Sequence, residues 1–203
     1  MEPASTTLSA RLDDAAPPPW PWPRLAAWLL VGALTGGLLP ALVGLADSGA
    51  FDLRPDVASP ATTIGVATLC YLAAGATGVR WMAWAAVPVT STLPFLAEVL
   101  GLSRWVLLTV VGMLLLGLGL ASRRRTTWPQ AAAMAGYFGV ALLALQLAPR
   151  LGLALAGIAL AAHAAWDLRH YRRDAVVNRS LAVWCMGLDV ALGGICVVFA
   201  IAG

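Results

Sequence analysis

Seven long apolar runs, separated by short clusters of charge, constrain this sequence more than any other feature. Each run is close to the roughly twenty residues that a helix needs to cross a ~30 Å hydrocarbon core. A spanning segment must also satisfy its own backbone hydrogen bonds, which favours helices. The sequence therefore predicts an all-α, polytopic transmembrane bundle of seven spans, or of six if two runs merge into a re-entrant hairpin. The runs are residues 25–46, 61–79, 81–101, 104–121, 128–148, 151–168 and 180–202.

The scarcity of charge supports the same conclusion. Of the 203 residues, 60% are hydrophobic and 11% are charged, whereas soluble domains carry about 25% charged residues to wet their surface. We therefore expect the lipid bilayer to be the main solvent, with the protein in the cell membrane and no nucleic acid as partner. All basic residues are arginine. A rhodopsin function is excluded, because no lysine is present to hold a retinal Schiff base.

Arginines are distributed unevenly over the loops of a seven-span arrangement. One side holds ten of them, and the other side holds only Arg54, Arg104 and Arg150. Positive residues near the ends of spans gather on the cytoplasmic side of a membrane. This bias predicts a cytoplasmic N-terminus and an external C-terminus. Residues 1–24, which end in a run of prolines and tryptophans, are predicted to form a disordered cytoplasmic tail, and residues 25–203 a single transmembrane domain.

The last two runs contain the first group of candidate functional residues. A titratable side chain inside a span is costly, so each one is a candidate by default. His163, Asp167 and His170 fall at i, i+4 and i+7, which places them on one helix face. Cys185 and Asp189 fall on one face of the final run. Counted from the loop that both helices share, the two stripes lie at matching depth, so we expect them to face each other.

Several kinds of chemistry fit these residues. His163 with Asp189 could act as general acid and base, or the group could form a path for protons or cations. His163 and Asp167 could also bind a divalent metal, but only two histidines exist and the HxxxD spacing has low specificity, so this question stays open. The structural alternative is that Asp167, His170 and Asp174 lie in the headgroup zone and pair with neighbouring arginines.

The run 81–101 contains the second group. Pro88 and Pro94 flank a Thr-Ser-Thr stretch that includes Ser91 and Thr92. Each proline deletes a helix hydrogen bond and frees a carbonyl, so a broken or kinked helix is predicted at mid-membrane, an arrangement found at binding sites. Glu98 shares a face with Ser91, nearer the outer side. The alternative is an ordinary kinked helix whose hydroxyls bond back to the chain, with Glu98 reaching outward.

The stretch HAAWDLRHYRRDAVVNRS, followed by VWCMGLD, resembles a signature of uncharacterised bacterial multi-span membrane proteins, and this resemblance implies no activity. In size, span count and reliance on a few buried acids, the chain is also similar to the small seven-span membrane terpene cyclases. That similarity implies Asp189 and Glu98 as proton donors. It is one of architecture, since no distinctive motif of those cyclases is present. An aspartate-rich DDxxD pair is also missing, which disfavours metal-dependent prenyl transfer.

Three hypotheses follow. The leading one is a membrane-embedded enzyme or binding protein for a lipid-like or isoprenoid molecule, with no metal or other cofactor predicted. The second is a small proton-linked transporter or channel that uses Asp189 and Glu98 as way stations. The third is a structural membrane subunit in which these groups only hold helices together. In the leading hypothesis the catalytic residues are His163, Asp167 and Asp189, and the substrate-binding residues are Ser91, Thr92, Glu98, Trp166 and Cys185.

Overall fold

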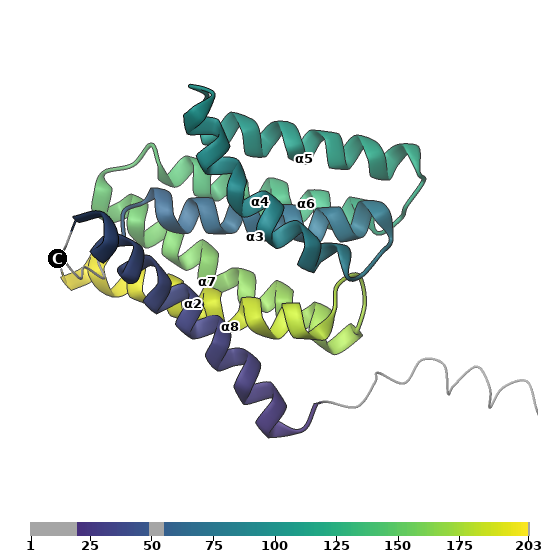
Figure 1. Ribbon diagram of the computed structural model, residues 1–203, viewed down its shortest axis with the longest axis horizontal. Helices are drawn as coiled ribbons and strands as arrows, with labels where there is room; N and C mark the ends of the chain where they lie inside the picture. Colours follow the sequence, from purple (N-terminus) through teal and green to yellow (C-terminus); the bar gives the residue numbers. More distant parts are fainter. Residues whose placement is uncertain (1–19, 49–54, 203) are drawn as a thin grey trace, which may run out of the picture.

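The computed structural model describes residues 20–48 and 55–202, and for residues 39–48 the backbone alone. Within these ranges the chain forms seven α-helices and no strand, which confirms the all-α prediction. Consecutive helices turn back at alternate ends of one bundle (Figure 1). The helices are α2 (Trp22–Ser48), α3 (Ala58–Thr77), α4 (Met82–Val99), α5 (Arg104–Ala121), α6 (Thr127–Ala144), α7 (Pro149–Arg173) and α8 (Arg179–Ala202).

Each predicted run corresponds to one helix, and most boundaries agree within a few residues. α2 begins at Trp22, before the predicted residue 25, because Pro23 is tolerated in the first turn of a helix. α7 continues past residue 168 to Arg173. Its last turn is held by tertiary packing, since His170 is buried there. Residues 1–19 of the predicted tail lie outside the described residues.

Four of the described helices, α4, α5, α7 and α8, are long and apolar enough to cross a membrane. The chain is therefore a membrane protein. α3 is not among the four. It lies at the centre of the bundle and packs against α4, α5, α6, α7 and α8 (Figure 1). The hydroxyls of Thr63 and Thr68 donate to backbone carbonyls one turn earlier in the same helix, so they are satisfied within the bundle.

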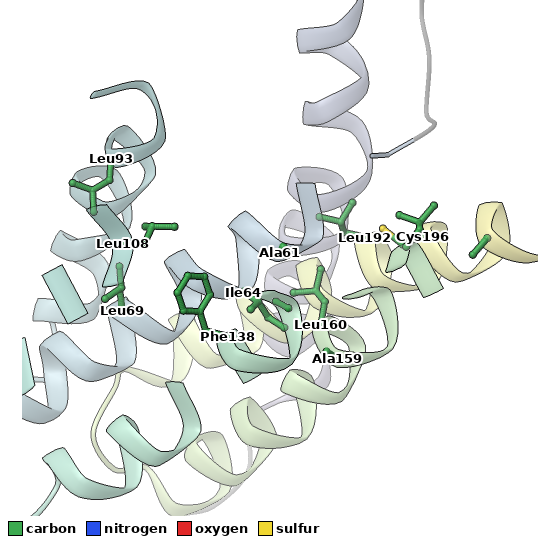
Figure 2. Packing of buried hydrophobic residues seen from close by; sticks show 13 residues of the cluster. Ala61, Ile64, Leu69, Leu93, Leu108, Phe138, Ala159, Leu160, Leu192 and Cys196 are labelled. Atoms are coloured by element: carbon green, nitrogen blue, oxygen red, sulfur yellow. The ribbon is translucent and has the colours of Figure 1, made fainter. Parts of the chain in front are cut away.

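One of two hydrophobic core clusters among the described residues lies between α3 and α6 and extends to α7 and α8. Figure 2 shows Phe138 of α6 beside Ile64 and Leu69 of α3. Gly65 permits this close approach, because a Cβ at that position would lie 2.8 Å from a ring carbon of Phe138. The core thus fixes α6 against the central helix and leaves α7 to pack beside both.

Glycines allow α8 to approach α7 and α2 very closely. A Cβ on Gly193 would lie 2.6 Å from the carbonyl oxygen of Gly157, and a Cβ on Gly157 would lie 2.9 Å from that of Gly193. On the other flank of α8, Gly32 and Gly36 of α2 face its backbone, and Gly187 faces the backbone of α2. Small residues at such crossings let helix backbones meet in a membrane. Short polar side chains of α7 and α8 can therefore reach one another.

The outer helices α4 and α5 present apolar side chains to the surroundings. Phe95 is 69% exposed, and Val106 and Met113 are also exposed. A break or a kink is predicted for this region. The structure has no break there: α4 continues as one helix through Pro88 and Pro94. The freed carbonyls are tolerated without a break of the helix.

Candidate functional site

His163 of α7 and Asp189 of α8 face each other inside the bundle, as their matching depth predicts. Nδ1 of His163 lies 2.8 Å from Oδ2 of Asp189. Both residues are inaccessible to solvent, with 0% exposure. One turn further along α7, Oδ1 of Asp167 lies 3.7 Å from the same histidine nitrogen, and Asp167 is equally buried. One imidazole nitrogen is therefore close to two buried acidic side chains.

Tyr71 of α3 completes this cluster, and no sequence pattern singles it out. Its hydroxyl donates a hydrogen bond of 2.6 Å to Oδ1 of Asp167. Its ring packs edge-on against His163, with 5.7 Å between ring centroids, and Tyr137 of α6 packs against the same histidine at 5.0 Å. The available signal was that a buried tyrosine hydroxyl needs a polar partner. Which partner it finds depends on the packing of α3 against α7.

A second polar network lies one turn further along α7. Nδ1 of His170 lies 2.9 Å from the carbonyl oxygen of Trp166 and therefore donates to it. Nε2 of His170 is left to accept from the amide nitrogen of Gln130, at 3.1 Å. The indole of Trp166 in turn donates to the amide oxygen of Gln130, at 3.2 Å. His170 is thus a neutral, fully bonded side chain, and it does not pair with neighbouring arginines.

Asp174 has a structural role. It forms an ion pair with Arg80, and Arg179 approaches the same carboxylate oxygen at 3.7 Å. Arg80 also donates two hydrogen bonds to the carbonyl of Val177. These contacts tie the turn between α3 and α4 to the turn between α7 and α8. The sequence-based alternative, in which Asp174 pairs with its neighbours on α7, is not what the structure has.

A cleft of about 620 Å³ leads from the surface to this cluster. It lies between two packed groups of helices, α2 with α8 and α3 with α4, and its wall is mostly apolar. Phe95 and Glu98, both exposed, line its outer part, and the buried Asp189 lines its inner part. Trp184 of α8 also lines it and begins a row of three tryptophans that joins α8 to Trp84 of α4 and Trp28 of α2.

Most of the residues predicted to bind substrate meet in this cleft. Ser91, Glu98 and Cys185 line it together with Asp189. Glu98 is held at the outer end by Arg104, with 2.6 Å between Oε1 and the guanidinium.

Two of the predicted substrate-binding residues lie elsewhere. Thr92 donates its hydroxyl hydrogen bond back to the carbonyl of Val89 and does not line the cleft. Trp166 also lies outside the cleft, because its indole is engaged by Gln130. A hydroxyl in a helix has its own backbone as an alternative partner, so the hydroxyl of Thr92 is satisfied without a ligand.

Several buried polar atoms have no hydrogen-bond partner among the described residues. They include Oδ1 of Asp189 and the hydroxyl oxygen of Thr62, and both of these residues line the cleft. Oδ2 of Asp167 and Nε2 of His163, deeper in the bundle, are also buried without a hydrogen-bond partner in the described part of the chain. Because buried polar groups are normally hydrogen-bonded, each such atom calls for a partner. Asp189 and Thr62 thus border the cleft, and each holds an oxygen, unpartnered within the described ranges, that is buried just behind its wall.

The cluster offers two kinds of chemistry. The contact between His163 and Asp189 is suited to proton exchange, and His163, Asp167 and Asp189 also form a set of nitrogen and oxygen atoms that a cation could bind. The cleft supplies access to either. Comparison with known proteins adds no relative to these observations: no family model matches the sequence, no curated protein matches it, and no solved structure matches the fold.

Proposed function

We propose that the protein is a membrane-embedded enzyme that binds a lipid-like or isoprenoid molecule in the cleft and acts on it with His163 and Asp189 as an acid–base pair. One observation carries this proposal. Asp189 uses one carboxylate oxygen for His163, while its other oxygen has no partner among the described residues, and the residue lines the cleft. An acid–base residue needs this double contact, with a proton partner on one side and the substrate on the other.

The size and lining of the cleft favour an apolar substrate with few polar atoms. Its volume of about 620 Å³ lies within the range of small-molecule sites, which combine apolar walls with a few placed polar groups. Thr62 and Asp189 supply such groups. The exposed Phe95 lies on a helix whose outer surface is apolar. The substrate would therefore enter sideways from the lipid phase.

The chemistry follows from the two contacts of Asp189. A proton on its free oxygen can pass to an electron-rich carbon or oxygen of the bound molecule. The carboxylate that remains is then stabilised by the N–H of His163 on its other oxygen. The reverse transfer removes a proton from the substrate. Of the two proton donors that the similarity to membrane terpene cyclases implies, Asp189 fits this role better, because Glu98 is ion-paired at the surface.

The proposal includes a seven-span arrangement in the cell membrane with the N-terminus in the cytoplasm. Its support is the position of the arginines. The turns that join α3 to α4, α5 to α6 and α7 to α8 lie at one end of the bundle (Figure 1) and carry Arg80, residues 123–125 and Arg179 at or beside them. Arg104 and Arg150 begin α5 and α7 at the other end. By the positive-inside rule the first end is cytoplasmic, so the outer part of the cleft faces the outside.

Identification of the bound molecule tests the proposal. The protein is purified in a mild detergent, and the lipids that remain bound are extracted and identified by mass spectrometry. We expect a stoichiometric apolar molecule in the native protein and its loss in Ser91→Trp, which fills the cleft. Val89→Trp is the matched control, because Val89 lies on the same helix and points away from the cleft. Equal lipid content in the two variants would contradict binding in the cleft.

The catalytic part has its own test in the Asp189→Asn variant. The asparagine keeps the size of the side chain but cannot transfer a proton. We expect it to retain the unreacted substrate, whereas the native protein retains a mixture of substrate and an isomer or adduct of it. If native and variant proteins hold the same molecule, the protein is a binding protein and not an enzyme.

A proton-linked transporter is the second candidate, and one feature favours it. Polar contacts continue beyond Asp189 through His163 and Asp167 to Tyr71. Beyond Tyr71 lies the ring of His170, at 4.9 Å between centroids. Reconstituted vesicles would decide between the candidates. Proton or solute flux that appears with the native protein and vanishes with Asp189→Asn would establish transport and overturn the enzyme proposal.

A further inference from the structure

The cluster at the inner end of the cleft has the composition of a metal site. His163, Asp167 and Asp189 each contribute one nitrogen or oxygen atom, and these three atoms all lie within 4.8 Å of one another. From this arrangement we propose that the three residues bind one divalent metal ion of the first transition row, such as Mn²⁺, Fe²⁺ or Zn²⁺. One imidazole with two carboxylates is a ligand set that suits these ions, whereas Mg²⁺ and Ca²⁺ prefer oxygen alone.

The balance of charge supports a divalent ion. Asp167 and Asp189 are fully buried, and their ion-pair partner among the described residues is His163. Isolated charges are very costly in such surroundings unless they are paired or coordinate a metal. Two ionised carboxylates, a neutral imidazole and a doubly charged cation sum to zero. The complete site would thus be electrically neutral within an apolar bundle.

Unpartnered atoms provide a second and independent observation. Oδ2 of Asp167 and Oδ1 of Asp189 are buried and have no hydrogen-bond partner among the described residues. A cation between the two carboxylates would satisfy them by direct coordination. Tyr71 would serve as an outer partner, because its hydroxyl already donates to Oδ1 of Asp167 and holds that carboxylate in place. Such outer hydrogen bonds orient the ligands of metal sites.

The role of the ion rests on the lipid-binding part of the proposed function, although its binding does not, and the ion would replace the acid–base pair. Because Asp189 lines the cleft, an ion bound to it would act as a Lewis acid beside the polar group of the substrate. His163 and Asp189 would then hold the ion instead of sharing a proton. The same three side chains cannot do both at once, so added metal and protons compete for the cluster.

Metal content and cobalt binding test the inference. The tag-free protein is analysed by elemental mass spectrometry, stripped with a chelator and titrated with Co²⁺, and then with Zn²⁺ as competitor. We expect one Co²⁺ per chain, with strong visible absorption from four- or five-fold coordination, and displacement by one equivalent of Zn²⁺. Asp167→Asn and Asp189→Asn should weaken binding by more than about 100-fold, since loss of even an outer partner costs 10- to 100-fold.

Asp174→Asn is the matched control, because Asp174 lies on the same stretch of chain but pairs with Arg80. It should bind Co²⁺ like the native protein. Absence of stoichiometric binding to the native apoprotein, or unchanged binding in both cluster variants, would overturn the inference. If the cluster variants fail to fold, the Co²⁺ titration of the native protein is sufficient to decide. Bound lipid without metal would leave the proposed function intact. Bound lipid with metal would keep the lipid-binding part of that function and replace its acid–base step, and bound metal without lipid would contradict lipid binding alone.

Discussion

The α7–α8 pair and the α4–α5 pair show how packing determines the role of an acidic side chain. α7 and α8 meet backbone to backbone at Gly157 and Gly193, and Asp189 is buried against a histidine at this contact. α4 and α5 present exposed apolar side chains, and Glu98 pairs with Arg104 at the surface. Both acids lie in apolar runs of the sequence. Only the acid in the close-packed pair is placed where it could do chemistry.

The contrast also explains where the cleft lies. Glycines allow the backbone of α8 to lie against those of α7 and α2, whereas α4 packs on α3 and α5. The space between these two groups is bridged by tryptophan rings and not by close backbone contacts. The tight region thus holds the buried polar cluster, and the loose region holds the cleft. Four substitutions test this difference between the two regions.

His163→Ala should have the largest effect. It leaves Asp167 and Asp189 buried together without the imidazole that contacts both, and breaking a buried pair in this way costs about 3–5 kcal/mol. The free energy of unfolding in mixed detergent micelles measures the loss. Addition of salt should not change it, because buried charges are poorly screened. A loss below about 1 kcal/mol would mean that the cluster is reached by water.

Tyr71→Phe should have the next largest effect. It removes the 2.6 Å hydrogen bond to Asp167, and a bond to a charged group contributes about 1.5–3 kcal/mol. Tyr137→Phe is the control on the other side of His163, because its hydroxyl makes only a long, exposed contact of 3.4 Å to the carbonyl of Ala162. Thermal unfolding of both variants is compared with that of the native protein. Equal losses would show that the hydrogen bond from Tyr71 to Asp167 does not stabilise the protein.

Gly193→Ala tests the close contact itself. The added methyl group would meet the backbone of α7, and such overpacking costs about 1–3 kcal/mol. The neighbouring Gly194→Ala meets no atom within 4 Å and should be neutral or slightly stabilising, because alanine favours helix. Unfolding of the two variants by a denaturing detergent gives the difference. Similar stability of both would show that α7 and α8 are not in backbone contact.

Glu98→Gln should have the smallest effect. Its side chain is 60% exposed, and exposed ion pairs contribute under about 1 kcal/mol. Any loss should shrink as salt is added, in contrast to that of His163→Ala. The same unfolding measurement at low and high ionic strength shows this. A large, salt-independent loss would place Glu98 in a buried site and erase the difference between the two regions.

Much of the candidate site was predictable from spacing. A helical period of 3.6 places residues at i and i+4 on one face, and two helices joined by a short loop bring equal depths together. The contact between His163 and Asp189 follows from these two facts. Tyr71 comes from a helix more than ninety positions away in the sequence, so no local pattern could identify it. The same holds for the ion pair of Asp174 with Arg80.

Three properties follow from the sequence alone: which segments are helices, that the chain is a membrane protein, and which face of α7 and α8 is polar. These properties depend on the length, hydropathy and periodicity of single segments, which neighbours along the chain establish. Packing between helices sets which acid is buried, which tyrosine reaches it, where the cleft opens and that α4 stays continuous. Each of these depends on the distance between helices that are far apart in sequence, and that distance is set by side-chain volume at their crossings.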